Sequence, residues 1–410
     1  MGACSSLLHQ HPARQSKERA EVTSLVLRVD REEADLEASV QTYLSSSPRS
    51  PAAAPARTAP CCALALAPTT LLLSRERPAG ADEICFIEGG GFYASVLLPF
   101  YASLGLPRLL LFEWVGANKF FNRCARAGLV TLLEEEGCEG AWIVYPNGGY
   151  HERTAQALRN YRKSRSARDK EALEAAVALA EQEGPLAAPD FSSTGYSFIA
   201  WWVQPSCVAG LRHTLSLLKA EAGALAQGGK PTVQTEEAAF EAFVMAAAGK
   251  REPTFDRSAS STGRPENYAP YDPALLKRCE AYLHTIRDLR PRHTPCLRLL
   301  HTAGSDFLAK ATGTPAAEMY FHYPYEAAYA TLHVHIRSQN FALAQVGSQR
   351  RSFDLPSVIQ ALEAGVDFSS APLNFWWKRD GTSTETLISL AQAQGRHHAS
   401  ADDNVTLHLF

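Results

Sequence analysis

The stretch that decides the fold reads FHYPYEAAYATLHVHIRSQN and runs from Phe321 to Asn340. The chain has only 13 histidines, yet this stretch holds three of them, His322, His333 and His335. Apolar and polar residues alternate strictly in its TLHVHIR segment. Because successive side chains of a strand point to opposite faces, this alternation predicts a strand with one apolar face and one polar face.

The polar face of this strand gathers groups that carry chemistry. Thr331, His333, His335 and Arg337 share it, while Leu332, Val334 and Ile336 share the other face. Two imidazoles and a guanidinium suit an anionic substrate, because imidazole can act as nucleophile or acid and arginine can hold phosphate oxygens in a fork. A zinc site is less well supported, since no third ligand has an obvious spacing. A purely structural role, as the polar face of an edge strand, stays open.

Composition places few limits on the function. The 410 residues, 46 % of them hydrophobic, are enough for two or three ordinary domains with a substantial core. A formal net charge of −3 argues against a surface that coats nucleic acid. Nine cysteines without a C-x-x-C pair or a secretory signal predict reduced thiols in an intracellular protein. The longest apolar stretches are broken by proline, so we expect no membrane-spanning helix.

Residues 1–80 are expected to form an anchor and a disordered linker. The start, MGACSS, fits a lipidation pattern in which Gly2 carries myristate and Cys4 carries palmitate, and two acyl chains would hold the protein on a membrane surface. A chance match in a flexible terminus has equal weight. Residues 45–78 are rich in Ala, Pro and Ser, a composition that resists packing. The expected location is the cytoplasm, with membrane attachment through N-myristoylation and palmitoylation, or a nuclear location, as alternatives.

Residues 81–260 are expected to form an α/β or α+β domain of unknown role. Short apolar segments such as AWIVYP predict buried strands, and residues 166–184 have the apolar spacing of an amphipathic helix. The glycine-rich EGGG at residues 88–91 lacks the spacing of a phosphate-binding loop and predicts a turn. Trp201 and Trp202 stand in an alternating apolar run, which favours a place in the core over a base-stacking surface.

Five motifs in the last third of the chain follow one another in an order that resembles a known family. They are HTIRDLRPRHTPCLRLLHTAG from His284, FHY from Phe321, ATLHVHI from Ala330, RSFDLPSVIQALE from Arg351 and LNFWWKRDGTSTETLISL from Leu373. Their succession over Ala281 to Phe410 resembles the histidine triad superfamily, whose motif is H-φ-H-φ-H-φ-φ. The similarity is greatest to its scavenger mRNA decapping branch, the 7-methylguanosine cap diphosphatases.

The resemblance implies both a fold class and an activity. Residues 265–410 would be an α+β catalytic domain with an antiparallel sheet of the histidine triad type and helices toward the C-terminus, preceded by the separate domain at 81–260. The implied enzyme is a hydrolase, an m7GpppX diphosphatase, that cleaves the triphosphate bridge of capped mRNA remnants. It also implies a homodimer, a capped oligonucleotide or dinucleotide as substrate, and neither a cofactor nor a metal.

The same resemblance implies roles for individual residues. His333 would be the nucleophile, His335 would stabilise charge on the phosphate oxygens, and His322 would assist the phosphate or the leaving group. Tyr329 would contact the substrate, and Arg351 would clamp a phosphate. Arg337 is added as a substrate-binding residue because strand alternation, not the resemblance, points it the same way.

The chain departs from the family pattern in three ways. Thr331 replaces the first histidine of the triad, two extra residues separate His322 from the motif, and the D-L-K-W segment that contacts the cap in the family is not found. A nucleophilic imidazole needs a hydrogen-bond acceptor for its other ring nitrogen. In the superfamily a backbone carbonyl near the first motif position serves this purpose, so Thr331 can still provide it.

Several alternatives follow from these departures. In a shifted register His335 would be the nucleophile and Arg337 would take the last triad position. The activity could be that of a dinucleoside polyphosphate hydrolase or a nucleotidyl transferase, or the protein could be an inactive, membrane-tethered nucleotide or cap sensor. Candidate rings for stacking on a methylated base are Trp201, Trp202, Trp376 and Trp377.

Overall fold

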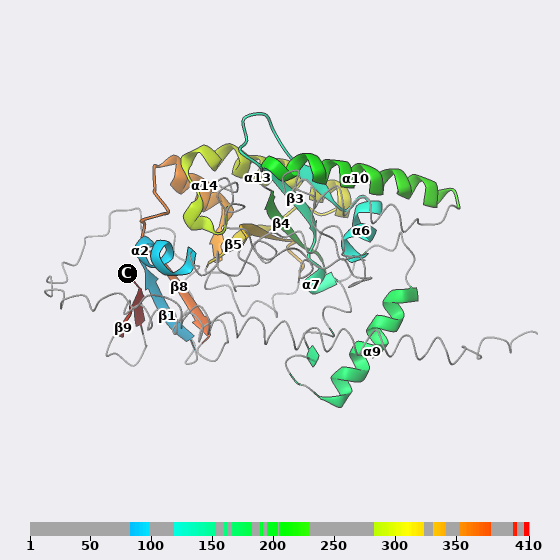
Figure 1. Ribbon diagram of the computed structural model, residues 1–410, viewed down its shortest axis with the longest axis horizontal. Helices are drawn as coiled ribbons and strands as arrows, with labels where there is room; N and C mark the ends of the chain where they lie inside the picture. Colours follow the sequence, from blue (N-terminus) through cyan, green and yellow to red (C-terminus); the bar gives the residue numbers. More distant parts are fainter. Residues whose placement is uncertain are drawn as a thin grey trace, which may run out of the picture.

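The computed structural model in Figure 1 describes a core assembled from several separate segments of the chain. The described residues are 83–98, 119–151, 157, 160–161, 164, 166–182, 189, 191, 195–203, 205–228, 283–323, 331–341, 352–378, 397–399 and 406–409. The expected linker and lipidation sites in residues 1–80 lie outside them.

A six-stranded sheet forms the centre of the fold. Its strand order is β2-β3-β4-β6-β5-β7, and every neighbouring pair is antiparallel. The strands are β2 (Thr131–Leu133), β3 (Ala141–Pro146), β4 (Ser197–Val203), β5 (Glu318–His322), β6 (His333–Arg337) and β7 (Ser352–Asp354). The predicted α+β class with an antiparallel sheet is confirmed.

A second sheet of four strands combines residues from distant parts of the chain. Its order is β8-β1-β10-β9, where β1 pairs antiparallel with β8 and parallel with β10. The strands are β1 (Glu83–Glu88), β8 (Leu373–Lys378), β9 (His397–Ala399) and β10 (Thr406–Leu409).

Both sheets cross the domain boundary that the sequence predicted near residues 260–265. In the central sheet β4 pairs with β6, and in the second sheet β1 pairs with β8 and β10. Strands of 81–260 and of 265–410 thus exchange backbone hydrogen bonds along continuous ladders. The expectation of a separate preceding domain is corrected, because the earlier segment supplies half of the sheet that carries the histidines.

The helices are distributed around these sheets. They are α2 (Gly90–Phe92), α6 (Lys119–Arg126), α7 (Gly148–His151), α9 (Ala167–Gln182), α10 (Pro205–Ala226), α13 (Thr294–Thr312) and α14 (Leu355–Glu363). A π-helix (Tyr93–Leu97) follows α2, and two 3₁₀ turns, η4 (Ile286–Asp288) and η5 (Pro291–His293), precede α13. The amphipathic helix predicted at 166–184 corresponds to α9.

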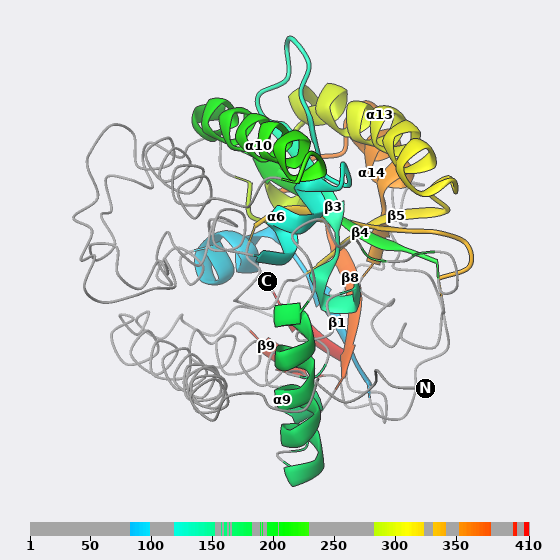
Figure 2. The ribbon, with the colours of Figure 1, turned by 90° about the vertical axis from the view of Figure 1, so that its right-hand side faces the viewer.

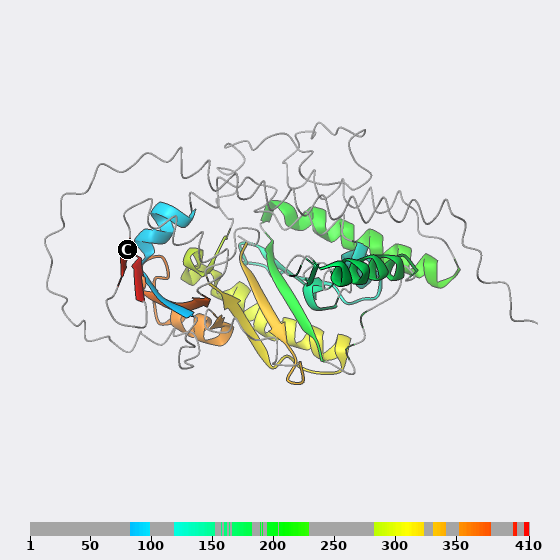
Figure 3. The same cartoon turned by 90° about the horizontal axis from the view of Figure 1, so that it is seen from below.

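Helix α13 covers one face of the central sheet. It ends at Gly313, whose φ of 74° is the left-handed conformation that glycine adopts at little cost. Leu300 and Leu308 are fully buried on its inner face, and the Trp142 indole N–H donates to the Cys296 carbonyl at 3.0 Å. Figures 1 and 2 show α10, α13 and α14 on the same side of the strands, and Figure 3 shows the strands from the opposite side.

The alternation of β4 and β6 separates this apolar face from a polar one. On the helix-covered face, Phe198 pairs with Ile336 and Ala200 pairs with Val334. Trp202 lies on the same face, and all five residues are buried. The opposite face therefore receives the histidines of β6, as the sequence predicted.

The EGGG segment is a strand-to-helix junction, not the predicted turn. β1 ends at Glu88 and α2 begins at Gly90. A Cβ at Gly90 would overlap the Ser369 carbonyl, so the missing side chain permits a close approach of two backbones. No helix in the described ranges is long and apolar enough to span a bilayer.

Candidate active site

The three histidines of the opening stretch come together on the polar face of the central sheet. His333 and His335 lie on β6 with ring centroids 5.1 Å apart, and His322 on β5 lies 4.5 Å from His335. His333 is 4 % exposed and His322 is 8 % exposed, whereas His335 is half-buried. His322 and His335, 13 positions apart in sequence, thus belong to one imidazole cluster, because β5 and β6 pair antiparallel.

The backbone at Thr331 fixes the orientation of His333. The Nδ1 atom of His333 lies 2.8 Å from the Thr331 carbonyl oxygen. A carbonyl can only accept, so Nδ1 carries the proton and Nε2 carries the lone pair in the neutral ring. The contact expected of Thr331 is present although its side chain is not a histidine.

Trp201 forms one wall beside His333. The two residues are partners in the β4–β6 register, and their ring centroids lie 4.3 Å apart at an angle of 37°. Trp202 faces the other way and packs edge-on against Trp142 in the core. Both tryptophans are buried, as predicted, but only Trp202 has a purely structural setting. Strand alternation alone signals this difference, since adjacent residues point to opposite faces.

Tyr320 and Ser352 are site residues that the sequence analysis missed. The Tyr320 ring stacks on His335 at 5.4 Å and 18°, and Ser352 Oγ lies 3.3 Å from His322 Nδ1. Tyr320 stands two positions before His322 on β5, so the same alternation could have placed it on the polar face. Ser352 becomes visible only from the β5–β7 register, which pairs it with His322.

Arg337 extends the polar face beyond His335. Its side chain is 3 % exposed, and Cζ lies 5.1 Å from the centroid of the Tyr320 ring. The strand alternation that pointed Arg337 toward the histidines is confirmed.

His151 is a neutral histidine near this end of the site. Burial lowers the pKa of His151 to about 4, against a smaller opposing effect of its hydrogen bond with Ser197. The neutral His151 ring accepts from the Ser197 backbone N–H at 2.9 Å.

Comparison with known proteins assigns the segment that carries this cluster. Residues 274–350 match the family model described as "Scavenger mRNA decapping enzyme C-term binding". This segment is a scavenger decapping domain. The match includes α13, β5 and β6, and with them all three histidines, Thr331 and Arg337. No curated protein matches the chain.

The sheet of the decapping domain is completed by residues outside the matched range. β4, which supplies Trp201, and β7, which supplies Ser352, lie before and after it. Within the segments that the structure describes, no group of three or more His, Cys, Asp or Glu side chains is arranged to hold a metal.

Several predicted site residues lie outside the described part of the chain. These are Tyr329, Arg351, Gly2 and Cys4. The backbone of Trp376 and Trp377 belongs to β8, but their side chains are also outside the description. Their predicted roles stay predictions.

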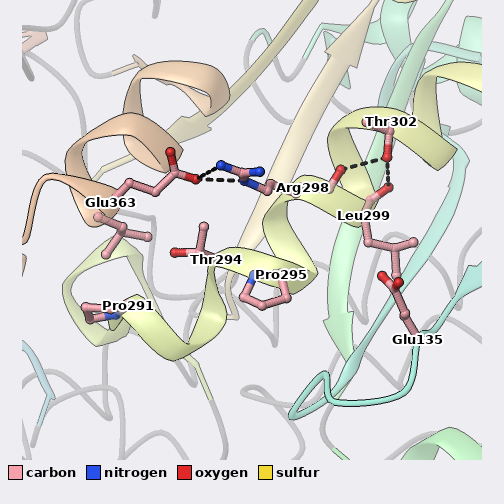
Figure 4. Close-up of a pocket in the computed structure, with 9 residues that line it drawn as sticks. Glu135, Pro291, Thr294, Pro295, Arg298, Leu299, Thr302 and Glu363 are labelled. Carbon is pink, nitrogen blue, oxygen red and sulfur yellow. Dashed lines mark hydrogen bonds and ion pairs between the residues drawn. The ribbon is translucent and has the colours of Figure 1, made fainter.

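A groove of about 800 Å³ lies on the helix side of the decapping domain (Figure 4). It runs between α13 and α14, and an ion pair of 2.6 Å between Arg298 and Glu363 crosses it. Arg298 is 64 % exposed at its side chain. This open surface lies over the sheet face opposite the imidazole cluster, so we assign the candidate chemistry to the cluster and not to the groove.

Proposed function

We propose that this protein cleaves the triphosphate bridge of short capped dinucleotides, m7GpppN, that remain after mRNA decay. The observation that carries the proposal is the Nδ1 contact of His333 with the Thr331 carbonyl, formed beside His335 and His322 within a decapping domain. This geometry leaves the Nε2 lone pair of a neutral ring as the nucleophile.

The reaction proceeds in two balanced steps. His333 Nε2 attacks the phosphorus that carries 7-methylguanosine, the N–P bond forms, and the P–O bond to the nucleoside diphosphate breaks. Water then attacks the same phosphorus and loses a proton to the solvent, the N–P bond breaks, and 7-methylguanosine monophosphate leaves the regenerated neutral imidazole. The nucleoside diphosphate leaves with a proton at its terminal oxygen or as the anion, according to pH.

The neighbouring histidines support charge in both steps. His335 stacks on Tyr320 and adjoins His333, so it is placed to donate a hydrogen bond to a phosphoryl oxygen that gains charge. His322, whose Nδ1 faces Ser352 Oγ, assists the phosphate or the leaving group. Tyr329 and Arg351 are proposed to contact and clamp the substrate, as the family resemblance implies.

The decisive experiment compares variants of the full chain on several substrates. The His333→Asn protein should lose at least about 10³-fold in turnover of m7GpppG while still binding it, because the imidazole is needed for bond formation more than for affinity. The matched control is His301→Asn, which changes an exposed histidine of α13 and should leave turnover unchanged. Products are identified by chromatography and mass spectrometry.

The other outcomes separate the alternatives. Full turnover in His333→Asn together with loss in His335→Asn would establish the shifted register. Cleavage of diadenosine tri- or tetraphosphate in preference to m7GpppG would indicate a dinucleoside polyphosphate hydrolase. Binding of the capped dinucleotide without cleavage of any substrate would indicate a sensor and contradict the proposed reaction.

A further inference from the structure

A buried arginine at the far end of the histidine row has two nitrogen atoms without hydrogen-bond acceptors. The Nε and Nη1 atoms of Arg337 are buried and have no hydrogen-bond partner. The Oγ atom of Ser197 is in the same condition, and Ser197 is the direct partner of Arg337 in the β4–β6 register. Ser197 is fully buried and Arg337 is 3 % exposed. Two donor groups without acceptors therefore lie side by side on one sheet face.

Among the described residues, aromatic rings lie around the guanidinium. Its Cζ atom lies 5.1 Å from the ring centroid of Tyr320, 5.6 Å from that of Phe341 and 6.0 Å from that of Tyr150. Glu318 is its partner across the β5–β6 ladder, but no ion pair joins these two described residues. Three aromatic rings from the described part of the chain therefore contact the cation.

Such an arrangement is costly unless an anion completes it. Burial of a charge requires a partner or several hydrogen bonds, and cation–π contacts with Tyr and Phe offset only part of the loss of water. Buried donors in native proteins are almost always satisfied, so a cluster of unsatisfied ones indicates a missing acceptor. An oxyanion with several acceptor atoms fits a guanidinium and a hydroxyl together.

The cluster is continuous with the proposed catalytic residues. Arg337 follows His335 by two positions and His333 by four on the same face of β6, which corresponds to about 7 and 13 Å along a strand. The Tyr320 ring bridges the gap, because it stacks on His335 and also faces the guanidinium. A single elongated anion can therefore contact the imidazoles at one end and Arg337 at the other.

We propose that Arg337 and Ser197 form a second phosphate subsite, which holds the far end of the phosphate chain while the histidines act at the near end. The identity of the substrate rests on the proposed function, but the binding of a phosphate group does not. The subsite favours polyphosphate chains over single phosphates and, in the reaction above, receives the diphosphate leaving group.

Inorganic tripolyphosphate tests the subsite without any turnover. Calorimetric titration of the full chain at constant ionic strength should show binding, with orthophosphate binding more weakly. Arg337→Met should weaken tripolyphosphate binding by about tenfold to a hundredfold, the usual loss for hydrogen bonds to a charged donor. Arg298→Met removes an exposed arginine of α13 and should leave the affinity unchanged. Circular dichroism checks that each variant is folded.

Wild-type affinity for tripolyphosphate in folded Arg337→Met would overturn the subsite and leave Arg337 a structural cation within its aromatic rings. If that variant does not fold, Ser197→Ala decides: weaker binding by several-fold supports the subsite, and unchanged binding overturns it. If tripolyphosphate binding depends on Arg337 but no dinucleotide is cleaved, the subsite stands and the proposed function fails. If m7GpppG is cleaved and Arg337→Met binds tripolyphosphate as tightly as the wild type, the function stands and the subsite fails.

Discussion

At the scale of single residues, the informative substitution is Thr331 in the position where the family has its first histidine. The structure uses this residue through its backbone, since the carbonyl oxygen is the atom that meets His333 Nδ1. A carbonyl is present whatever the side chain is, provided that the backbone keeps its path. The loss of one histidine from the motif is therefore compatible with an active nucleophile.

Thr331→Val tests this separation of backbone and side chain. The variant keeps β-branching and volume but removes the hydroxyl, so the carbonyl should still orient His333 and turnover should fall by less than about tenfold. Steady-state kinetics on m7GpppG give the comparison. A loss as large as that of His333→Asn would show that the Thr331 hydroxyl itself takes part in the reaction.

At the scale of elements, a tight contact before β4 holds the far end of the site. Gly195 has φ of 71°, and a Cβ there would come within 2.5 Å of Ser338 Oγ and 2.7 Å of the Phe341 nitrogen. The Tyr196 N–H also donates to Ser338 Oγ at 2.8 Å. The start of β4 and the turn after β6 thus fix each other, and this turn carries Phe341 onto Arg337.

Gly195→Ala should be much more destabilising than Gly313→Ala, although both glycines have almost the same φ. Each substitution should lower the free energy of unfolding by about 1 kcal/mol, because it places a side chain on a residue in the left-handed region. At Gly313 the added Cβ would meet nothing within 4 Å, whereas at Gly195 it adds about 1–3 kcal/mol of overlap. Urea denaturation measures both changes. Equal losses would mean that the turn after β6 shifts freely.

Sequence patterns predicted those elements whose signal is local. The strict alternation of TLHVHIR gave β6 and its two faces, and the spacing of residues 166–184 gave α9. The pairing of β4 with β6 was not predicted, because nothing in either strand specifies a partner more than 100 residues away. Tyr320 was missed as a site residue, and Trp201 could not be placed beside the histidines, for this reason: their neighbours on the sheet were unknown.

At the scale of the whole molecule, a buried ion pair connects β1 of the second sheet to the turn that precedes α13. The Arg287 guanidinium, from the 3₁₀ turn before α13, donates to the Glu88 carboxylate at 2.7 Å and to the Glu88 carbonyl at 2.8 Å. Glu88 is the last residue of β1, and the Tyr323 hydroxyl after β5 also donates to its carboxylate. Burial raises the pKa of Glu88, and the facing Arg287 opposes that rise. No local pattern in the sequence pairs Arg287 with Glu88, which lies 199 positions earlier.

The division of the chain near residue 260 was predicted from composition, and it failed for a physical reason. A polar, turn-rich stretch shows where a chain leaves the packed core, but it does not show whether the chain returns to the same sheet. Here the chain returns twice, through β6 beside β4 and through β8 beside β1. The earlier segment therefore builds half of the sheet that carries the histidines, where the sequence had predicted an independent unit.

Variants of the buried pair should show how much it contributes to the free energy of unfolding. Arg287→Met leaves the Glu88 carboxylate buried without its cation and should cost about 3–5 kcal/mol of unfolding free energy. The double variant Glu88→Met with Arg287→Met removes both charges and should recover part of that loss. Recovery is incomplete because the Phe368 carbonyl and the Tyr323 hydroxyl also lose their partners. Arg212→Met is the matched control: its pair with Glu134 is exposed, so the loss should be below about 1 kcal/mol. Chemical denaturation of all four proteins measures these values. A single-variant loss no larger than the control would mean that the sheets are held together by their apolar contacts alone.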